Sequence, residues 1–281
     1  MNTTKNTTKT KDNKINLIKK LLMCEQMELK ENVKNILKSR GYKPVDGDGF
    51  LYAEGKIPIL LVAHLDTVHK TKPTEIFYDS EQDVMWSPQG IGGDDRCGVY
   101  AILKLLCNHH PYVLFTEDEE KGCIGADKTV EVLKKPNVKF IIEIDRRGSD
   151  DCVFYDCGNQ KFQEYIEKFG FEFAWGSYSD ICVLSGEWDI ASVNLSSGYY
   201  NEHTDQEYIK LRELEKTIDR VRNILDDNEN AEFYDYQEKL YLSNTKALSY
   251  NSPYNSTYFD EWGYTDDEGK WHWYADERYY D

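Results

Sequence analysis

Short runs of aliphatic residues alternate along the chain with segments whose apolar residues recur at helical spacing. The runs at 59–63, 112–116 and 138–145 are short and rich in β-branched or aromatic residues, which is typical of buried strands. Residues 98–106 show helical spacing between the first two runs, and residues 125–135 do so after the second. Strands that alternate with helices predict an α/β domain around a largely parallel mixed sheet.

The flanking sequence predicts further elements. Residues 15–37 indicate one or two helices that end at Gly41, because their apolar residues recur every three or four positions. A short strand is expected at 50–53, a turn at 54–56, a helix at 161–170, a strand at 190–197 and a strongly amphipathic helix at 208–225. The central domain is therefore predicted to span residues 15–230.

The two ends of the chain differ from this domain. Residues 1–14 are rich in Thr, Lys and Asn without apolar periodicity, which predicts a disordered leader. Residues 226–281 contain 14 acids and 4 bases, and residues 231–281 contain 15 aromatic side chains. So many aromatic residues favour docking of this acidic segment, either onto the domain itself or onto a protein partner.

Charge and composition exclude several classes of function. The net charge of −17 disfavours nucleic acid as a partner, because phosphate binding depends on clustered Lys and Arg. No apolar window is long enough to cross a bilayer, and the polar start predicts no signal peptide, so a cytoplasmic protein without membrane contact is expected. The seven cysteines contain no CxxC pair and are expected to be reduced thiols.

Three of the predicted strands stop at residues that can bind metal. The first leads into His64, the second into the acidic run 117–120, and the third ends at Asp145. Taken singly, these are weak signals: a lone His is more often a surface residue, and acids commonly begin a helix. Because ligands of open α/β sheets bind at the carboxyl ends of the strands, their occurrence in order predicts one shared site.

The same residues carry a family resemblance. From Leu29 to Leu225 the chain resembles the co-catalytic dinuclear zinc peptidases and deacylases, relatives of tripeptidase T, glutamate carboxypeptidase, acetylornithine deacetylase and the tetrahedral aminopeptidases. The resemblance is carried, in the order of the family, by "AHLDTV", "GIGGDDRCG", "FTEDEEKGCIGA", "EIDR" and "NEHTDQEYI". It implies the three-layer catalytic core of zinc peptidases.

Position by position, the resemblance implies a centre of two zinc ions, with cobalt or manganese as substitutes. The implied metal ligands are His64, Asp94, Glu120, Asp145 and His203. Asp94 would bridge the two ions, Asp66 would orient the ring of His64, and Glu119 would be the general base. The pattern leaves open whether Asp95 replaces Asp94, and whether the two glutamates exchange roles.

These residue types suit amide hydrolysis. Zinc accepts imidazole nitrogen and carboxylate oxygen at about 2.0–2.2 Å, and one carboxylate can bridge two ions about 3.5–4 Å apart. A hydroxide that bridges the metals would attack the amide carbonyl, while Glu119 takes the proton and returns it to the departing amine. The expected function is a zinc-dependent hydrolase of short peptides.

The chain departs from many relatives in its spacing. Only 30 residues separate His64 from Asp94 and 58 separate Asp145 from His203, so neither gap leaves room for a lid or dimerisation domain. Relatives without a lid are mostly aminopeptidases, and an acidic protein attracts amines, so an aminopeptidase is favoured. The alternatives are an N-acyl amino acid deacylase with the same centre and a non-catalytic binding protein on this fold.

Other polar residues have less definite interpretations. Ser179 and Asp180 resemble a segment near the site of some relatives, although a plain turn is an equal alternative. Arg146 and Arg147 either meet a substrate carboxylate or neutralise the acidic site. Of the remaining histidines, His109 and His110 are expected to form a helix-terminal pair, and His69 and His272 lie outside any motif.

Overall fold

The computed structural model describes residues 15–238, 263–265 and 271–273. The chain divides into two units, residues 1–239 and 240–281. The described part of the second unit is one antiparallel pair, β13 (Gly263–Thr265) and β14 (Trp271–Trp273). The predicted leader, and the acidic segment from residue 239 apart from this pair, lie outside the described residues.

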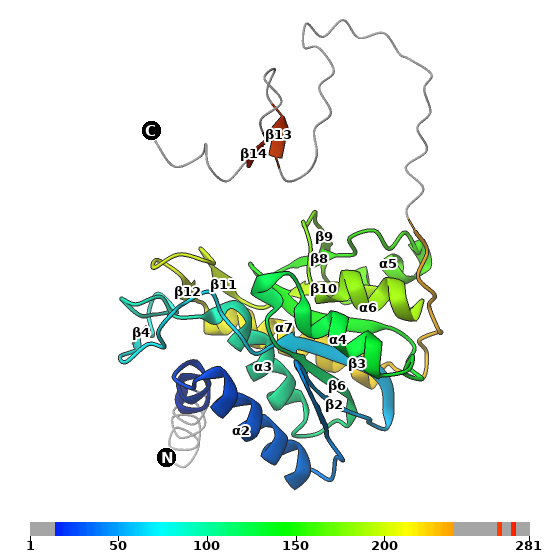
Figure 1. Ribbon diagram of the computed structural model, residues 1–281, viewed down its shortest axis with the longest axis horizontal. Helices are drawn as coiled ribbons and strands as arrows, with labels where there is room; N and C mark the ends of the chain where they lie inside the picture. The colour runs from blue at the N-terminus through cyan, green and yellow to red at the C-terminus, as the bar shows by residue number, and fades with distance from the viewer. Residues whose placement is uncertain (1–14, 239–262, 266–270, 274–281) are drawn as a thin grey trace, which may run out of the picture. The chain divides into compact units, whose positions relative to one another are not determined.

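The first unit is built around an eight-stranded sheet with the order β1-β2-β6-β3-β7-β10-β8-β9 (Figure 1). The strands are β1 (Val45–Gly47), β2 (Phe50–Ala53), β3 (Ile57–His64), β6 (Pro111–Thr116), β7 (Ile141–Arg146), β8 (Asp151–Val153), β9 (Glu172–Phe173) and β10 (Ser192–Ser196). The four central strands, β6, β3, β7 and β10, are parallel, whereas β2 and β8 pair antiparallel with them. The prediction of a largely parallel mixed sheet is confirmed.

Helices cover both faces of this sheet. They comprise helical residues 15–22, α2 (Gln26–Ser39), α3 (Gly93–Leu105), α4 (Ile124–Val132), α5 (Gln160–Glu167), α6 (Asp180–Trp188) and α7 (Leu211–Asp226). Helix α3 packs on β3, β7 and α7, while α4 and α6 pack on each other and on the opposite face (Figure 1). The domain therefore has the three layers that were predicted.

The position of strand β3 between two cores explains why its sequence is almost continuously apolar. Leu61 and Ala63 point into the core beneath α3 and α7, and Leu60 and Val62 point into the core beneath α4 and α6. A parallel strand covered on both faces buries every side chain, and each large aliphatic one contributes about 1.5–3 kcal/mol. The strand can change character only where it leaves the core, at His64.

A second, four-stranded antiparallel sheet was not predicted. It has the order β11-β12-β5-β4 and consists of β4 (Phe77–Asp79), β5 (Val84–Trp86), β11 (Tyr199–Tyr200) and β12 (Tyr208–Ile209). Strands of two or three residues show no readable alternation, and the pairing of β5 with β12 joins distant parts of the chain. This sheet links the segment before Asp94 to the hairpin that carries His203.

One boundary also differs from expectation, because strand β7 begins at Ile141 rather than Val138. Asp180, for which a plain turn was one of two alternatives, begins helix α6. The first residues of the acidic segment pack on the domain: Tyr234 is buried, and its backbone bonds to Lys139 and Ala191 at 2.9 Å each.

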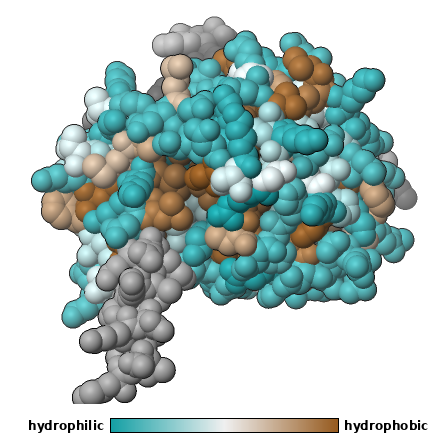
Figure 2. All heavy atoms as spheres, turned by 90° about the horizontal axis from the view of Figure 1, so that it is seen from below, coloured by the Kyte–Doolittle hydropathy of each residue, from teal (hydrophilic) through white to brown (hydrophobic). Residues whose placement is uncertain are grey.

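The face drawn in Figure 2 is mostly hydrophilic and is interrupted by separate apolar patches. Among the residues that the structure describes, no helix combines the length and the apolar character that a membrane span requires.

Candidate metal centre

The structure brings the five predicted metal ligands together at the carboxyl ends of the parallel strands. His64 is the last residue of β3, and Asp145 lies near the end of β7. Asp94 is in the first turn of α3, and Glu120 lies in the 3-10 turn η1 (Glu119–Lys121) that follows β6. His203 comes from the β11–β12 hairpin, whose pairing with β5 holds it over the edge of the main sheet.

Asp94 occupies the centre of this cluster. Its Oδ1 lies 3.1 Å from Nε2 of His64, and its Oδ2 lies 3.2 Å from Nε2 of His203. On the outer sides, Asp145 Oδ1 lies 3.5 Å from the His64 nitrogen, and Glu120 Oε2 lies 3.0 Å from the His203 nitrogen. The cluster thus consists of two pairs, His64 with Asp145 and His203 with Glu120, and the carboxylate of Asp94 lies between them.

Two ligands of a tetrahedral zinc ion, each about 2.0–2.2 Å away, lie about 3.3–3.6 Å from each other. The 3.5 Å distance between Asp145 and His64 falls in this range, and the distances of 3.0–3.2 Å are slightly shorter, so the ligands would move apart slightly around an ion. One ligand atom each from His64, Asp94 and Glu120 lie within 4.8 Å of one another. The other oxygen of Glu120, Oε1, is buried without a hydrogen-bond partner among the described residues. The donor set and this unpartnered oxygen suit a divalent cation.

The charges of the cluster support the same conclusion. Burial alone would lower the pKa of His64, but Asp145, Asp66 and Asp94 raise it well above its usual value. Burial raises the pKa of Asp145 strongly, and the charge of Asp94 adds to this effect. Hydrogen bonds to Asp94 and Glu120 raise the pKa of His203 to about 11. Concentrated negative charge in a buried place is costly unless cations offset it.

Asp66 and Glu119 lie beside the cluster. Asp66 Oδ1 is 3.2 Å from Nδ1 of His64, and its carboxylate accepts the backbone N–H groups of Glu119 and Glu120 at 3.1 and 3.2 Å. Burial, with the charges of Asp180 and Glu120, raises the pKa of Glu119 to about 8 although His64 lowers it. These surroundings favour the protonated form of the Glu119 carboxyl group in the metal-free chain.

The structure distinguishes the acids near the site from one another. Within the acidic run, Glu117 pairs with Lys30 at 2.7 Å, and Asp118 pairs with Lys121. Asp95 is fully buried, and its Oδ1 accepts the N–H group of Gly98 at 2.8 Å. Asp94, and not Asp95, therefore lies between the two histidines. The peptide bond that joins these aspartates is cis.

A second layer of buried acids lies next to the cluster. Glu143 is fully buried and accepts a 2.5 Å hydrogen bond from Ser179, and Asp180 accepts one from Thr116. The other carboxylate oxygens of Glu143 and Asp180 have no partner among the described residues. Sequence analysis missed Glu143, yet a charged residue inside an apolar strand, two positions before Asp145 and on the same face, was an available signal.

The remaining candidates occupy other surroundings. Arg147 pairs with Glu202 at 2.9 Å, and Arg146 donates to the carbonyl of Trp175 at 3.0 Å. Two other histidines lie away from the cluster: His109 bonds to Asp226, and His110 stacks on Tyr42. The side chain of His272 is not among the described ones.

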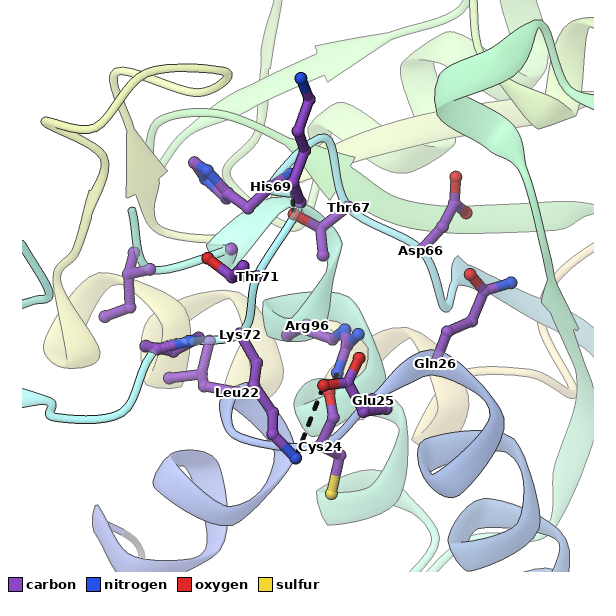
Figure 3. A pocket seen from close by; sticks show the side chains of 14 residues that line it. Leu22, Cys24, Glu25, Gln26, Asp66, Thr67, His69, Thr71, Lys72 and Arg96 are labelled. Carbon is purple, nitrogen blue, oxygen red and sulfur yellow. Dashed lines mark hydrogen bonds and ion pairs between the residues drawn. The ribbon is translucent and has the colours of Figure 1, made fainter. Parts of the chain in front are cut away.

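Two cavities differ in their relation to the site. One of about 110 Å³ has Asp66, His69 and Arg96 in its wall (Figure 3). A larger one of about 480 Å³ is lined by residues of α7 and contains none of the predicted site residues. The side chain of His203, which lines neither of these two cavities, is 52% exposed.

Comparison with known proteins places this geometry in context. No family model matches the sequence, and no curated protein matches it significantly. Among solved structures, the aminopeptidase PepT from Bacillus cereus matches with a TM-score of 0.65 over 77% of this chain and 98% of that chain, at 14% identity. The chain has the fold of these peptidases.

Two further solved structures of this peptidase fold agree. A tripeptidase from Staphylococcus aureus gives a TM-score of 0.65 at 14% identity, with 77% of this chain and 98% of that chain covered. An aminopeptidase from the archaeon Desulfurococcus kamchatkensis gives 0.59 at 15% identity, with 77% and 95% covered. The predicted resemblance is confirmed at the level of the fold.

Proposed function

We propose that this chain is a dinuclear zinc-dependent exopeptidase that removes residues from the N-terminus of short peptides. The observation that carries the proposal is the position of Asp94, whose two oxygens face two different histidines at 3.1 and 3.2 Å. A carboxylate in this position is suited to joining two cations. The peptidase names of the neighbours in fold support the same class of reaction.

Each half of the cluster would hold one ion. His64 with Asp145 would bind the first, His203 with Glu120 would bind the second, and Asp94 would be shared. When bound, zinc polarises a carbonyl oxygen and lowers the pKa of water towards neutrality. Cobalt and manganese, which accept the same nitrogen and oxygen donors, would be substitutes.

The protein's own residues would orient the site and move the proton. Asp66 would hold the His64 ring with Nε2 facing Asp94, because it engages the other ring nitrogen at 3.2 Å. Glu119 would take a proton from the attacking water and later give it to the departing amine. In the metal-free chain burial raises the pKa of Glu119, which favours a carboxyl group that holds a proton between the two transfers.

The charges around the site favour the amino end of a peptide. A carboxypeptidase needs a cation for the terminal carboxylate. Arg147 is paired with Glu202, and Arg146 is bound to the carbonyl of Trp175 and lies 3.6 Å from Asp151, so both arginines already have partners. An acidic surface, in contrast, attracts a protonated α-amine.

Product analysis tests the proposal. The zinc-loaded chain should release N-terminal residues from peptides with free amines and leave N-acetylated peptides intact. Release of the acyl group from N-acyl amino acids instead would assign the deacylase function. No turnover of either substrate by a chain that binds zinc would favour the non-catalytic binding protein.

A further inference from the structure

Glu207, which is not one of the proposed metal ligands, connects three segments of the site. It lies just before β12, on the hairpin that carries His203, and only 1% of its surface is exposed. Its Oε1 accepts the N–H group of Asp94 at 2.9 Å, and its Oε2 accepts that of Gly92, also at 2.9 Å. The same Oε2 lies 2.9 Å from Nε2 of His69. One buried carboxylate therefore makes three polar contacts.

The glycines of "GIGGDD" are explained by these contacts. A Cβ atom at Gly93 would lie 3.1 Å from Glu207 Oε1 and 2.9 Å from a carbon of Ile209. At Gly90, which has a φ of +79°, a Cβ would lie 2.1 Å from the ring of His69. The backbone must come this close to His69 and Glu207, so the glycine-rich sequence serves a close approach inside the protein.

Glu207 and His69, which contact each other, each lie close in the sequence to a proposed ligand. Glu207 accepts the backbone N–H group of the proposed ligand Asp94 and lies four residues after the proposed ligand His203. His69 follows His64 by five residues, on the loop that also carries Asp66 (Figure 3). The loop is closed locally, because the N–H group of His69 donates to Thr67 Oγ1 at 3.2 Å.

The energetics favour a positioning role. Burying a carboxylate costs several kcal/mol unless its hydrogen bonds are satisfied, and an apolar side chain of similar volume often gives equal or greater stability. A carboxylate, however, forms directional hydrogen bonds. The two N–H groups and the imidazole fix the orientation of the Glu207 carboxylate, and the carboxylate in turn fixes the orientation of these three groups. The turn from Gly92 to Asp94 is thereby held in one arrangement relative to the hairpin.

We infer that Glu207 and His69 form a positioning pair that holds Asp94 between His64 and His203 before any metal binds. The inference rests on the proposed function, because it assigns to this pair the preorganisation of the proposed zinc site. Such outer partners of metal ligands typically change metal affinity by about 10–100-fold when they are replaced.

Zinc titration of the purified full chain, in competition with a chromogenic chelator, is the first test. Glu207→Gln keeps the volume but replaces one acceptor oxygen by a donor, and His69→Ala removes the ring. Each should weaken zinc binding about 10-fold or more. His69→Gln, which can still donate to Glu207, should restore most of the affinity. The matched control is His109→Ala, which removes a histidine from its 2.8 Å contact with Asp226 and should leave the affinity unchanged.

Hydrogen exchange of the zinc-free chain is the second test and does not depend on metal. Glu207→Gln should speed exchange of the Gly92 and Asp94 amides at least several-fold, while amides of α7 remain as in the wild type. Equal zinc affinity and equal exchange in the wild type and both variants would overturn the positioning role. A wild type with these two amides protected by Glu207 but without zinc binding would instead contradict the proposed function.

Discussion

The carboxylate of Asp66 lies 3.1 Å from the backbone nitrogen of Glu119. Through this contact, the residue that is placed to orient His64 also fixes the end of the segment that carries the proposed base. The end of β3 and the turn after β6 are thus held together by a hydrogen bond as well as by the sheet.

Asp66→Asn should therefore affect both metal binding and turnover. The amide retains the size of the carboxylate but can present only one acceptor oxygen, so either His64 or a backbone N–H group loses its partner. We expect zinc affinity to fall about 10–100-fold. Isothermal titration with zinc measures the change, and unaltered affinity would contradict the role of Asp66.

Glu119→Gln should separate metal binding from chemistry. The variant keeps the side-chain volume and the neighbouring Glu120 but cannot accept a proton. We expect zinc content to remain as in the wild type while kcat falls by about 100-fold or more. An active Gln variant would remove the assignment of Glu119 as base, and an inactive variant without metal would indicate that it is a ligand.

Ser179→Ala should destabilise the layer of acids next to the cluster. The change removes the donor of the 2.5 Å hydrogen bond to the fully buried Glu143, and a buried polar group left unpaired costs about 1–3 kcal/mol. Urea unfolding of the zinc-free chain measures this. Ser185→Ala in helix α6, which begins directly after Ser179, is the control; its hydroxyl donates to the neutral carbonyl of Ile190, and its loss should cost about 1 kcal/mol or less. Equal costs would contradict the argument.

Asp150 gives a prediction for pH. Burial by itself raises the pKa of Asp150, but Lys216, Ser149 and Arg220 lower it to about 2. A carboxyl group whose pKa is depressed on folding stabilises the fold above its unfolded pKa of about 3.9, and this stabilisation is lost as pH falls through the folded value. Because Asp150 is partly exposed, Asp150→Asn should cost only about 0.5–1 kcal/mol at pH 7.

The difference in unfolding free energy between the wild type and Asp150→Asn should shrink as the pH is lowered from 5 towards 2. Urea denaturation at several pH values checks this. A difference that grows with acidity would contradict the charge pairing of Asp150 with Lys216 and Arg220.

Much of the main fold could be predicted because its strands have both faces buried. The apolar run at 59–63 can only be a core strand or a buried helix segment, and its length and the helical pattern that follows decide for the strand. The small sheet could not be predicted, since β11 and β12 have two residues each and depend on pairing with distant β5. Local sequence carries no record of such pairing.

The candidate site divides in the same way. His64 and Asp145 follow predicted strands, so the residues themselves indicated them, whereas Asp94 and His203 were indicated by the family resemblance. His69 and Glu207 could not be recognised, because their role consists of contacts to each other and to the backbone N–H groups of Gly92 and Asp94. Backbone contacts leave a trace in the sequence only through the glycines that permit them.

The most direct test of the account is the metal content of the folded chain after dialysis against zinc, determined by mass spectrometry of the intact protein. We predict about two zinc ions per wild-type chain and none tightly bound in Asp94→Ala, since this carboxylate serves both halves of the cluster. A wild-type chain that retains no zinc, or an Asp94→Ala chain that retains as much as the wild type, would contradict the proposed centre.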